Sequence, residues 1–310
     1  MIRAVTGVWG VVTLFRPDEA PRLFTDLLPQ VDGIVAVDDG SGPASDAVLA
    51  RIAEGGVRVV RLEENSGIGA ALNLGIRTAR EAGAHAVVTF DQDSTVAPGF
   101  VAALHAAAVA AKEAGIPSGP VVPQYFAGVD QAGDPIVDGV VRAAHAIQSG
   151  MLIDAETLDR VGLMDAALFI DLVDTDYELR CADAGLPCIV APGLALPHQL
   201  GAQYRISGPL GRRLPVLTLS TPFRYYYRAR NRIVLARRYP HHRTRLRRDG
   251  LADRAYFVIA ALLARPRRAM WRLLRAGARD GRAGRLGRMD AELASAAAGI
   301  SWHAVRVSQD

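Results

Sequence analysis

Two carboxylates stand almost side by side at the end of an apolar run. Asp91 and Asp93 flank Gln92 in "VVTFDQDS", directly after the strand-forming residues 87–90. Side chains alternate across a strand, so both acids would point to one face if the strand continued through them. Like charges held there need a counter-charge, and Mg²⁺ or Mn²⁺ takes carboxylate and phosphate oxygens as ligands. The pattern indicates a divalent metal site, with a solvated turn as the alternative.

Two further polar segments end strands or open helices. In "VDDGS", Asp38 and Asp39 could accept hydrogen bonds from a nucleobase imide or a ribose hydroxyl, or could simply belong to a turn. In "ENSGIGAALNLG", a Gly-rich loop opening a helix offers backbone N–H groups to an anion. The alternative there is a turn with Asn65 as helix N-cap. This segment does not match the dinucleotide-binding motif G-x-G-x-x-G/A, because Leu72 occupies the position that needs Gly or Ala.

A fourth segment, "DLVDTDYELR", holds four acids in eight residues: Asp171, Asp174, Asp176 and Glu178. A carboxylate facing a cleft could act as general base on a hydroxyl, although Asp174 could also just cap the following helix. His198 follows in "LPHQLG", and a lone histidine is more often structural than a ligand.

The elements that must position these residues alternate between strands and helices. Apolar strands are expected at residues 8–15, 33–41, 57–62, 84–93 and 187–192, with helices at 66–83 and from the acidic segment to about Gly185. Residues 148–162 read as a strand followed by a short helix. The pattern predicts an α/β fold with a mostly parallel central sheet and flanking helices. Several acids would then lie at the C-terminal edge of the sheet, where open α/β sheets bind ligands.

The charge is divided unevenly along the chain. Residues 1–204 hold 12 Lys+Arg and 26 Asp+Glu, a net −14, whereas residues 205–310 hold 24 arginines and 6 acids, a net +18. We expect a catalytic domain over residues 1–204 and a basic helical extension over residues 205–310. No nucleic-acid motif accompanies the arginines, so nucleic acid is not expected as a partner. Cys181 and Cys188 have no metal or disulfide spacing, which is typical of a cytoplasmic protein.

The apolar run at residues 255–264 lies within this basic extension. As a helix it would be about 15 Å long, too short to span a bilayer core of about 30 Å. It suits a helix lying on an anionic membrane surface, at the inner face of the plasma membrane. The alternative is a helical subdomain that packs on the body or forms an oligomer. About the last 25 residues are expected to be partly disordered.

The order and spacing of six motifs resemble the inverting glycosyltransferases of family 2, which have a GT-A fold, and bacterial rhamnosyltransferases among them. The motifs are "DDGS", "ENSGIGAALNLG", "FDQDS", "QSGMLI", "FIDLVDTDYELR" and "YYYRARN", and the resemblance covers about residues 5–240. It implies a general base at Asp174 and a metal ion, Mg²⁺ or Mn²⁺, held by Asp93 with Asp91 and His198. The implied donor-binding residues are Thr13, Phe15, Pro17, Asp38, Asp39, Asn65, Gly67, Asn73, Asp91 and Gln92.

Two residues depart from the family pattern. Val173 stands where the family has Glu before the acid, and Tyr177 stands where Trp is commoner. The first departure leaves the base open between Asp174 and Asp176, of which we favour Asp174.

The resemblance implies transfer of L-rhamnose from dTDP-L-rhamnose to a glycan or lipid-linked glycan in cell-envelope polysaccharide synthesis. The alternatives are a UDP-hexose donor with the same fold, or a catalytically inactive interaction protein.

Overall fold

The computed structural model describes residues 6–117, 119–198, 201–207 and 213–307. By its contacts the chain divides into two compact units. One comprises the residues up to Ala166 together with Val173–His198, and the other comprises Ala167–Leu172 and the residues from Gln199 onward. We call them the sheet unit and the helical unit.

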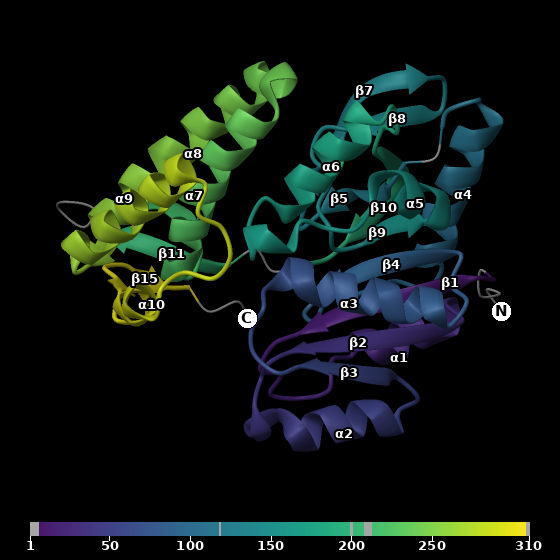
Figure 1. The fold of residues 1–310 in the computed structure, drawn as a ribbon, viewed down its shortest axis with the longest axis horizontal. Coiled ribbons are helices and arrows are strands. Elements are labelled where there is room, and N and C mark those ends of the chain that lie inside the picture. Colours follow the sequence, from purple (N-terminus) through teal and green to yellow (C-terminus); the bar gives the residue numbers. More distant parts are fainter. Residues whose placement is uncertain (1–5, 118, 199–200, 208–212, 308–310) are drawn as a thin grey trace. The chain divides into compact units, whose positions relative to one another are not determined.

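The sheet unit is built on a ten-stranded sheet with the order β3-β2-β1-β4-β9-β5-β10-β8-β7, in which β6 pairs with β5 (Figure 1). Its strands are β1 (Val8–Leu14), β2 (Gly33–Asp39), β3 (Arg58–Leu62), β4 (Ala86–Asp91), β5 (Val121–Phe126), β6 (Val129–Asp130), β7 (Ala132–Val137), β8 (Val140–Ala143), β9 (Met151–Asp154) and β10 (Ile189–Leu196). Strands β3, β2, β1 and β4 are mutually parallel, whereas β9 runs antiparallel to β4 and β5.

Helices cover both faces of this sheet. They are α1 (Leu23–Leu27), α2 (Asp46–Glu54), α3 (Ile68–Glu81), α4 (Phe100–Glu113), α5 (Ala155–Val161) and α6 (Val173–Asp183). The side chains of β1 alternate between the two faces: Val12 joins the core cluster that includes α1, α2 and α4, whereas Val11 meets α3 at Gly75. This alternation explains why these strands are apolar throughout.

The strand order reverses direction at β1. From β1 the chain moves outward to β2 and β3, and then returns through α3 to β4 on the other side of β1. In open α/β sheets the C-terminal edge at such a switch point is the usual ligand site. The ends of β1, β2 and β4, and the loop that opens α3, therefore form the expected ligand-binding edge.

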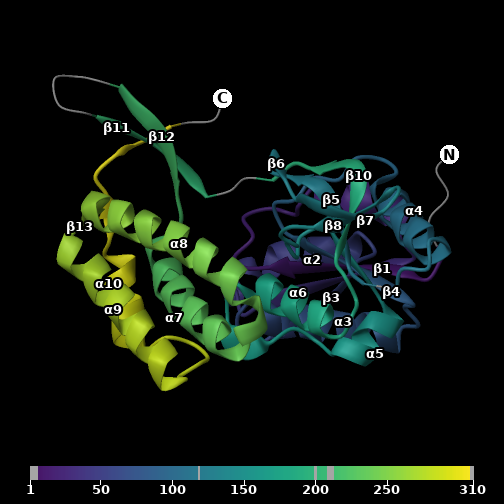
Figure 2. The same cartoon turned by 90° about the horizontal axis from the view of Figure 1, so that it is seen from above.

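The helical unit has a core of its own around α7 (Pro222–Arg238), α8 (Arg243–Leu263), α9 (Arg267–Ala283) and α10 (Ala291–Ala298), with α7, α8 and α9 side by side (Figures 1 and 2). It also contains the paired strands β11 (Ala202–Ser207), β12 (Arg213–Leu219) and β15 (Val305–Arg306), and the pair β13 (Ala264–Arg265) and β14 (Ser301–Trp302). A Cβ atom on Gly277 would lie 2.3 Å from the carbonyl oxygen of Tyr226, so glycine lets α9 pack directly on the α7 backbone.

The segment Ala167–Leu172 belongs to this helical unit, although its last two residues begin the acidic motif. The Asn231 side chain on α7 donates to the carbonyl oxygens of Leu168, Ile170 and Asp171 at 2.8–3.0 Å. The Asp171 carboxylate accepts from Arg224 at 2.9 Å and from Arg228 at 3.2 Å. Burial raises the pKa of Asp171, but the two arginines outweigh burial and hold it below its usual value.

Two expectations about the C-terminal region are corrected. Residues 291–307 form α10, β14 and β15, so partial disorder is wrong for the described part of the last 25 residues. The apolar run at residues 255–264 is not a separate short helix, because residues 255–263 end the longer helix α8 and Ala264 begins β13. Ala260 and Ala261 on that run pack into the core of the helical unit, and Val258, Ile259 and Leu262 are exposed. Among the described helices, none is both long and apolar enough to cross a membrane.

Candidate active site

The metal motif lies at the end of β4, at the switch point. Strand β4 ends at Asp91, whose carbonyl oxygen accepts from the Ser94 N–H at 3.1 Å and closes a turn. Asp93 lies in this turn, so the expectation that the strand continues through both acids is wrong. The turn nevertheless brings the carboxylates together, because their ligand atoms and that of His198 all lie within 4.8 Å of one another.

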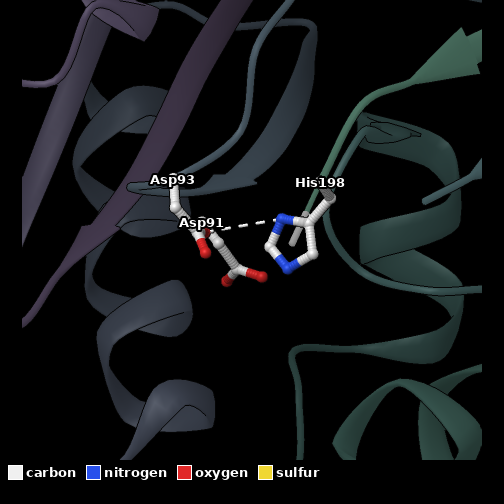
Figure 3. A group of neighbouring side chains, drawn as sticks. All are labelled: Asp91, Asp93 and His198. Carbon is white, nitrogen blue, oxygen red and sulfur yellow. Dashed lines mark ion pairs between the residues drawn. The ribbon is translucent and has the colours of Figure 1, made fainter. Parts of the chain in front are cut away.

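His198 reaches this pair from the segment that follows β10. Figure 3 shows the imidazole and both carboxylates turned toward one another. The His198 Nδ1 atom lies 3.4 Å from an Asp93 oxygen, but it is buried and makes no hydrogen bond among the described residues. A buried imidazole nitrogen without a hydrogen bond, next to two carboxylates, fits a ligand of a divalent ion such as Mn²⁺. This ion accepts carboxylate ligands, and imidazole is a common ligand of transition metals. Asp91, Asp93 and His198 could therefore hold such an ion.

Gln148, for which the sequence predicts no role, holds Asp91 in place. The Gln148 side chain, buried before β9, donates from Nε2 to Asp91 Oδ1 at 2.6 Å. Its Oε1 atom is buried and has no hydrogen-bond partner among the described residues. The neighbouring Ser149 Oγ accepts from the Asp91 backbone N–H at 3.1 Å. The motif "QSGMLI" was the available signal, but nothing in it says which side chain it contacts.

The acids at the end of β2 have different partners. Both oxygens of Asp39 accept backbone N–H groups, from Ser66 at 2.7 Å and from Gly67 at 3.0 Å. Asp38 is fully buried and forms an ion pair with Arg61 at 3.1 Å. Arg61 also hydrogen-bonds to Asp46, and this bond is the main cause of its raised pKa. Asp39 thus fastens the loop that opens α3 to the end of β2.

Gly40 makes the approach of these two loops possible. Its φ is +68°, and a Cβ atom there would lie 2.2 Å from the backbone carbon of Glu64. Only glycine accommodates both the left-handed conformation and the contact.

Hydrogen bonds also tie the loop after β1 to its neighbours. The Phe15 N–H donates to Gln92 Oε1 at 2.8 Å, and the Arg16 N–H donates to Ser41 Oγ at 2.7 Å. Thr13 pairs in register with Asp91 across β1 and β4. Phe15 is exposed, whereas Pro17 is buried. The edge is therefore a connected set of loops rather than separate turns.

The Gly-rich segment does not use Asn65 as the N-cap of the helix that it opens. The N-cap of α3 is Gly67, without a side-chain hydrogen bond, so Asn65 as N-cap is wrong. The Asn65 Oδ1 atom is buried without a hydrogen-bond partner among the described residues. Asn73 exchanges two hydrogen bonds of 2.9 Å with the backbone of Met164, deep in the unit. These contacts leave donor binding by Asn65 and Asn73 as a prediction.

The two base candidates lie in the first turn of α6 in different surroundings. Asp174 is half-buried, and its Oδ1 accepts from the Thr175 N–H at 2.7 Å. Asp176 is fully buried and pairs with Arg180 at 2.9 Å. Arg180 also donates to the carbonyl oxygens of Val161 and Leu163, which links α6 to the segment after α5. Tyr177 is buried as well, and burial raises its pKa.

Comparison with known proteins finds similar sequences and a similar fold. The sequence model of Glycosyl transferase family 2 matches residues 9–124, from β1 into β5. The dTDP-rhamnosyl transferase RfbF of Shigella flexneri is 29% identical over 249 residues, which cover 75% of this chain and 81% of the relative.

A solved structure of GalNAc-T7 with UDP, GalNAc and Mn²⁺ has a TM-score of 0.51 and 16% identity. The match covers 62% of this chain and 43% of that protein, so the chain spans less than half of its length. At this identity the likeness concerns the fold, which is GT-A-like. Together, the match of residues 9–124 to the family 2 model and the similarity to a rhamnosyl transferase support a glycosyltransferase.

Proposed function

We propose that this protein transfers L-rhamnose from dTDP-L-rhamnose, with inversion, to a hydroxyl group of a glycan or lipid-linked glycan in cell-envelope polysaccharide synthesis. The observation that carries the proposal is the convergence of Asp91, Asp93 and His198 at the switch-point edge, where the His198 Nδ1 atom makes no hydrogen bond among the described residues. The relative that is a dTDP-rhamnosyl transferase supports the choice of donor.

In this proposal the loops at the sheet edge hold the donor. Asp91, Asp93 and His198 would hold a divalent ion, Mg²⁺ or Mn²⁺, which supplies charge neutralisation for the leaving diphosphate when bound. Gln148 keeps the Asp91 carboxylate in one orientation through its 2.6 Å hydrogen bond. The Gly-rich loop and the ends of β1 and β2 surround the nucleoside. Because hydrogen bonds already join these loops, they lose little conformational entropy when the donor binds.

Asp174 is the proposed base. It accepts the proton of the acceptor hydroxyl as that oxygen attacks the anomeric carbon from the side opposite the diphosphate. One glycosidic C–O bond forms, the bond between the anomeric carbon and the diphosphate oxygen breaks, and dTDP leaves. Asp176 is less suited to this step, because it is enclosed and paired with Arg180.

Thermal unfolding with nucleotides tests the donor proposal. We expect dTDP and dTDP-L-rhamnose to stabilise the protein when Mn²⁺ is present. A ligand at 100 times its Kd adds about 2.7 kcal/mol, or about 5–10 °C in Tm for a domain of this size. In Asp93→Asn the Mn²⁺-dependent part of the shift should vanish. The matched control is Asp134→Asn, because Asp134 is an exposed acid on β7.

The outcomes separate the alternatives. Stabilisation by UDP-hexoses without stabilisation by dTDP compounds would replace the donor with a UDP-sugar. Binding of dTDP-L-rhamnose without hydrolysis or transfer to any glycan acceptor would favour an inactive interaction protein.

A further inference from the structure

Helix α8 has a second apolar face that the helical unit does not cover. Leu251, Val258 and Leu262 are 62%, 46% and 51% exposed, and Ala255 and Ile259 between them are exposed too. At about 100° per residue these five side chains lie on one side of the helix. The core-facing side carries Leu246, Ala260 and Ala261 instead. We call the exposed set the α8 stripe.

The charges around the α8 stripe are mainly positive. By the same helical periodicity, Arg247, Arg248 and Arg254 flank the stripe. Arg247 and Arg254 form no ion pair within the described part of the chain, and Arg248 lies 3.7 Å from Asp249. The two acids of α8, Asp249 and Asp253, lie on the opposite side and pair with Arg232 of α7. An apolar stripe bordered by arginines is complementary to an anionic, apolar surface.

A cavity adjoins the stripe between α7, α8 and α9. It has a volume of about 610 Å³ and is lined by the apolar side chains of Leu246, Phe257 and Leu274. Arg247, Arg254 and Arg282 line it as well, so the first two arginines border both the cavity and the stripe. Guanidinium groups bind phosphate oxygens through paired hydrogen bonds. The cavity can thus take a phosphate together with the start of an acyl chain.

We propose that the α8 stripe and this cavity dock the protein on a membrane surface that contains anionic phospholipid, with a lipid phosphate bound by Arg247 and Arg254. A second copy of the chain is the weaker occupant, because two such faces would bring arginines against arginines. Nucleic acid does not account for the apolar stripe. The proposal is independent of the donor and of the reaction.

Co-sedimentation with vesicles tests it on the full chain, without nucleotide sugar. We expect binding to phosphatidylcholine vesicles that contain about 30% phosphatidylglycerol, weakening as salt is added, and little binding to phosphatidylcholine alone. The double variant Val258→Glu/Leu262→Glu should bind at least tenfold more weakly. The double variant Arg247→Ala/Arg254→Ala should lose about fivefold per arginine.

Matched controls are Val129→Glu, an exposed valine of the sheet unit, and Arg51→Ala, an exposed arginine of α2, and both should bind as the wild type does. Unchanged Tm values would show that the variants are folded.

Four results would overturn the proposal. The first is no binding of the wild type to anionic vesicles at low salt, and the second is unchanged binding by the stripe variant. The third is a dimer in gel filtration that the stripe variant converts to a monomer without any change in vesicle binding. As a further arm, soluble short-chain phosphatidylglycerol should compete with vesicles. Equal competition by inorganic phosphate would mean that the cavity recognises phosphate alone, which also contradicts membrane docking.

Discussion

Asp174 and Asp176 are two residues apart on α6, and we expect their amide variants to fail in different ways. Asp174→Asn keeps an oxygen for the Thr175 N–H and loses a charge in the first helical turn, which is worth about 0.3–1 kcal/mol of stability. If Asp174 is the base, turnover should fall about 10²- to 10⁴-fold, which is about 2.7–5.5 kcal/mol in the activation barrier.

Asp176→Asn should instead cost stability. It removes the charge partner of Arg180, whose other nitrogens bond the carbonyl oxygens of Val161 and Leu163. Breaking a buried pair costs about 3–5 kcal/mol, and we expect the lower end because the Arg180 side chain is 25% exposed.

The assay pairs urea unfolding with transfer from dTDP-L-rhamnose to glycan acceptors, at a temperature where both variants are folded. Asp174→Asn should unfold near the wild-type midpoint with little turnover, and Asp176→Asn should unfold early while its folded fraction retains most of the activity. An active Asp174→Asn beside a stable but inactive Asp176→Asn would refute the assignment of the base.

Three further predictions concern other residues. Asp93→Ala should abolish transfer without unfolding the protein, and EDTA should inhibit the wild type, so full activity in EDTA would contradict a metal role. Gln148→Ala removes a hydrogen bond to a proposed ligand and should weaken Mn²⁺ binding about 10- to 100-fold, as followed by electron paramagnetic resonance; unchanged binding would mean that Gln148 only fills space. Asp171 has a lowered pKa because Arg224 and Arg228 outweigh burial. It therefore adds stability above its unfolded pKa of about 3.9 that is lost as pH falls through its folded value. Asp171→Asn should be less stable than the wild type at pH 7, with the difference shrinking below about pH 4 in urea titrations, and a pH-independent difference would contradict the ion pairs.

Local sequence was sufficient for much of the sheet unit. Apolar runs such as residues 87–90 predict buried strands because both faces of a parallel sheet are covered. Parallel strands present their carboxyl ends at one edge, so the acids after β2 and β4 could be assigned to the same region without coordinates. The predicted end of the acidic helix near Gly185 also agrees with α6, which ends at Asp183.

Contacts between distant residues were decided by the tertiary structure alone. Gln148, which precedes β9, meets Asp91 at the end of β4, and no local pattern encodes that contact. Asn65 resembled an N-cap, but Gly67 holds that position while the Asp39 carboxylate binds the loop. The turn that closes on Asp91 likewise overrode the strand expected through Asp93.

Burial distinguishes residues that look equivalent in the sequence. Asp174 and Asp176 look alike in sequence, but a helix rotates by about 200° over two residues, so Asp174 is half-buried and Asp176 is enclosed beside Arg180. In the same way, composition marked residues 255–264 as apolar, yet only packing shows which side of α8 is covered and which is exposed. A sequence determines which residues can do chemistry or bury surface, whereas their partners depend on how elements far apart along the chain are brought together.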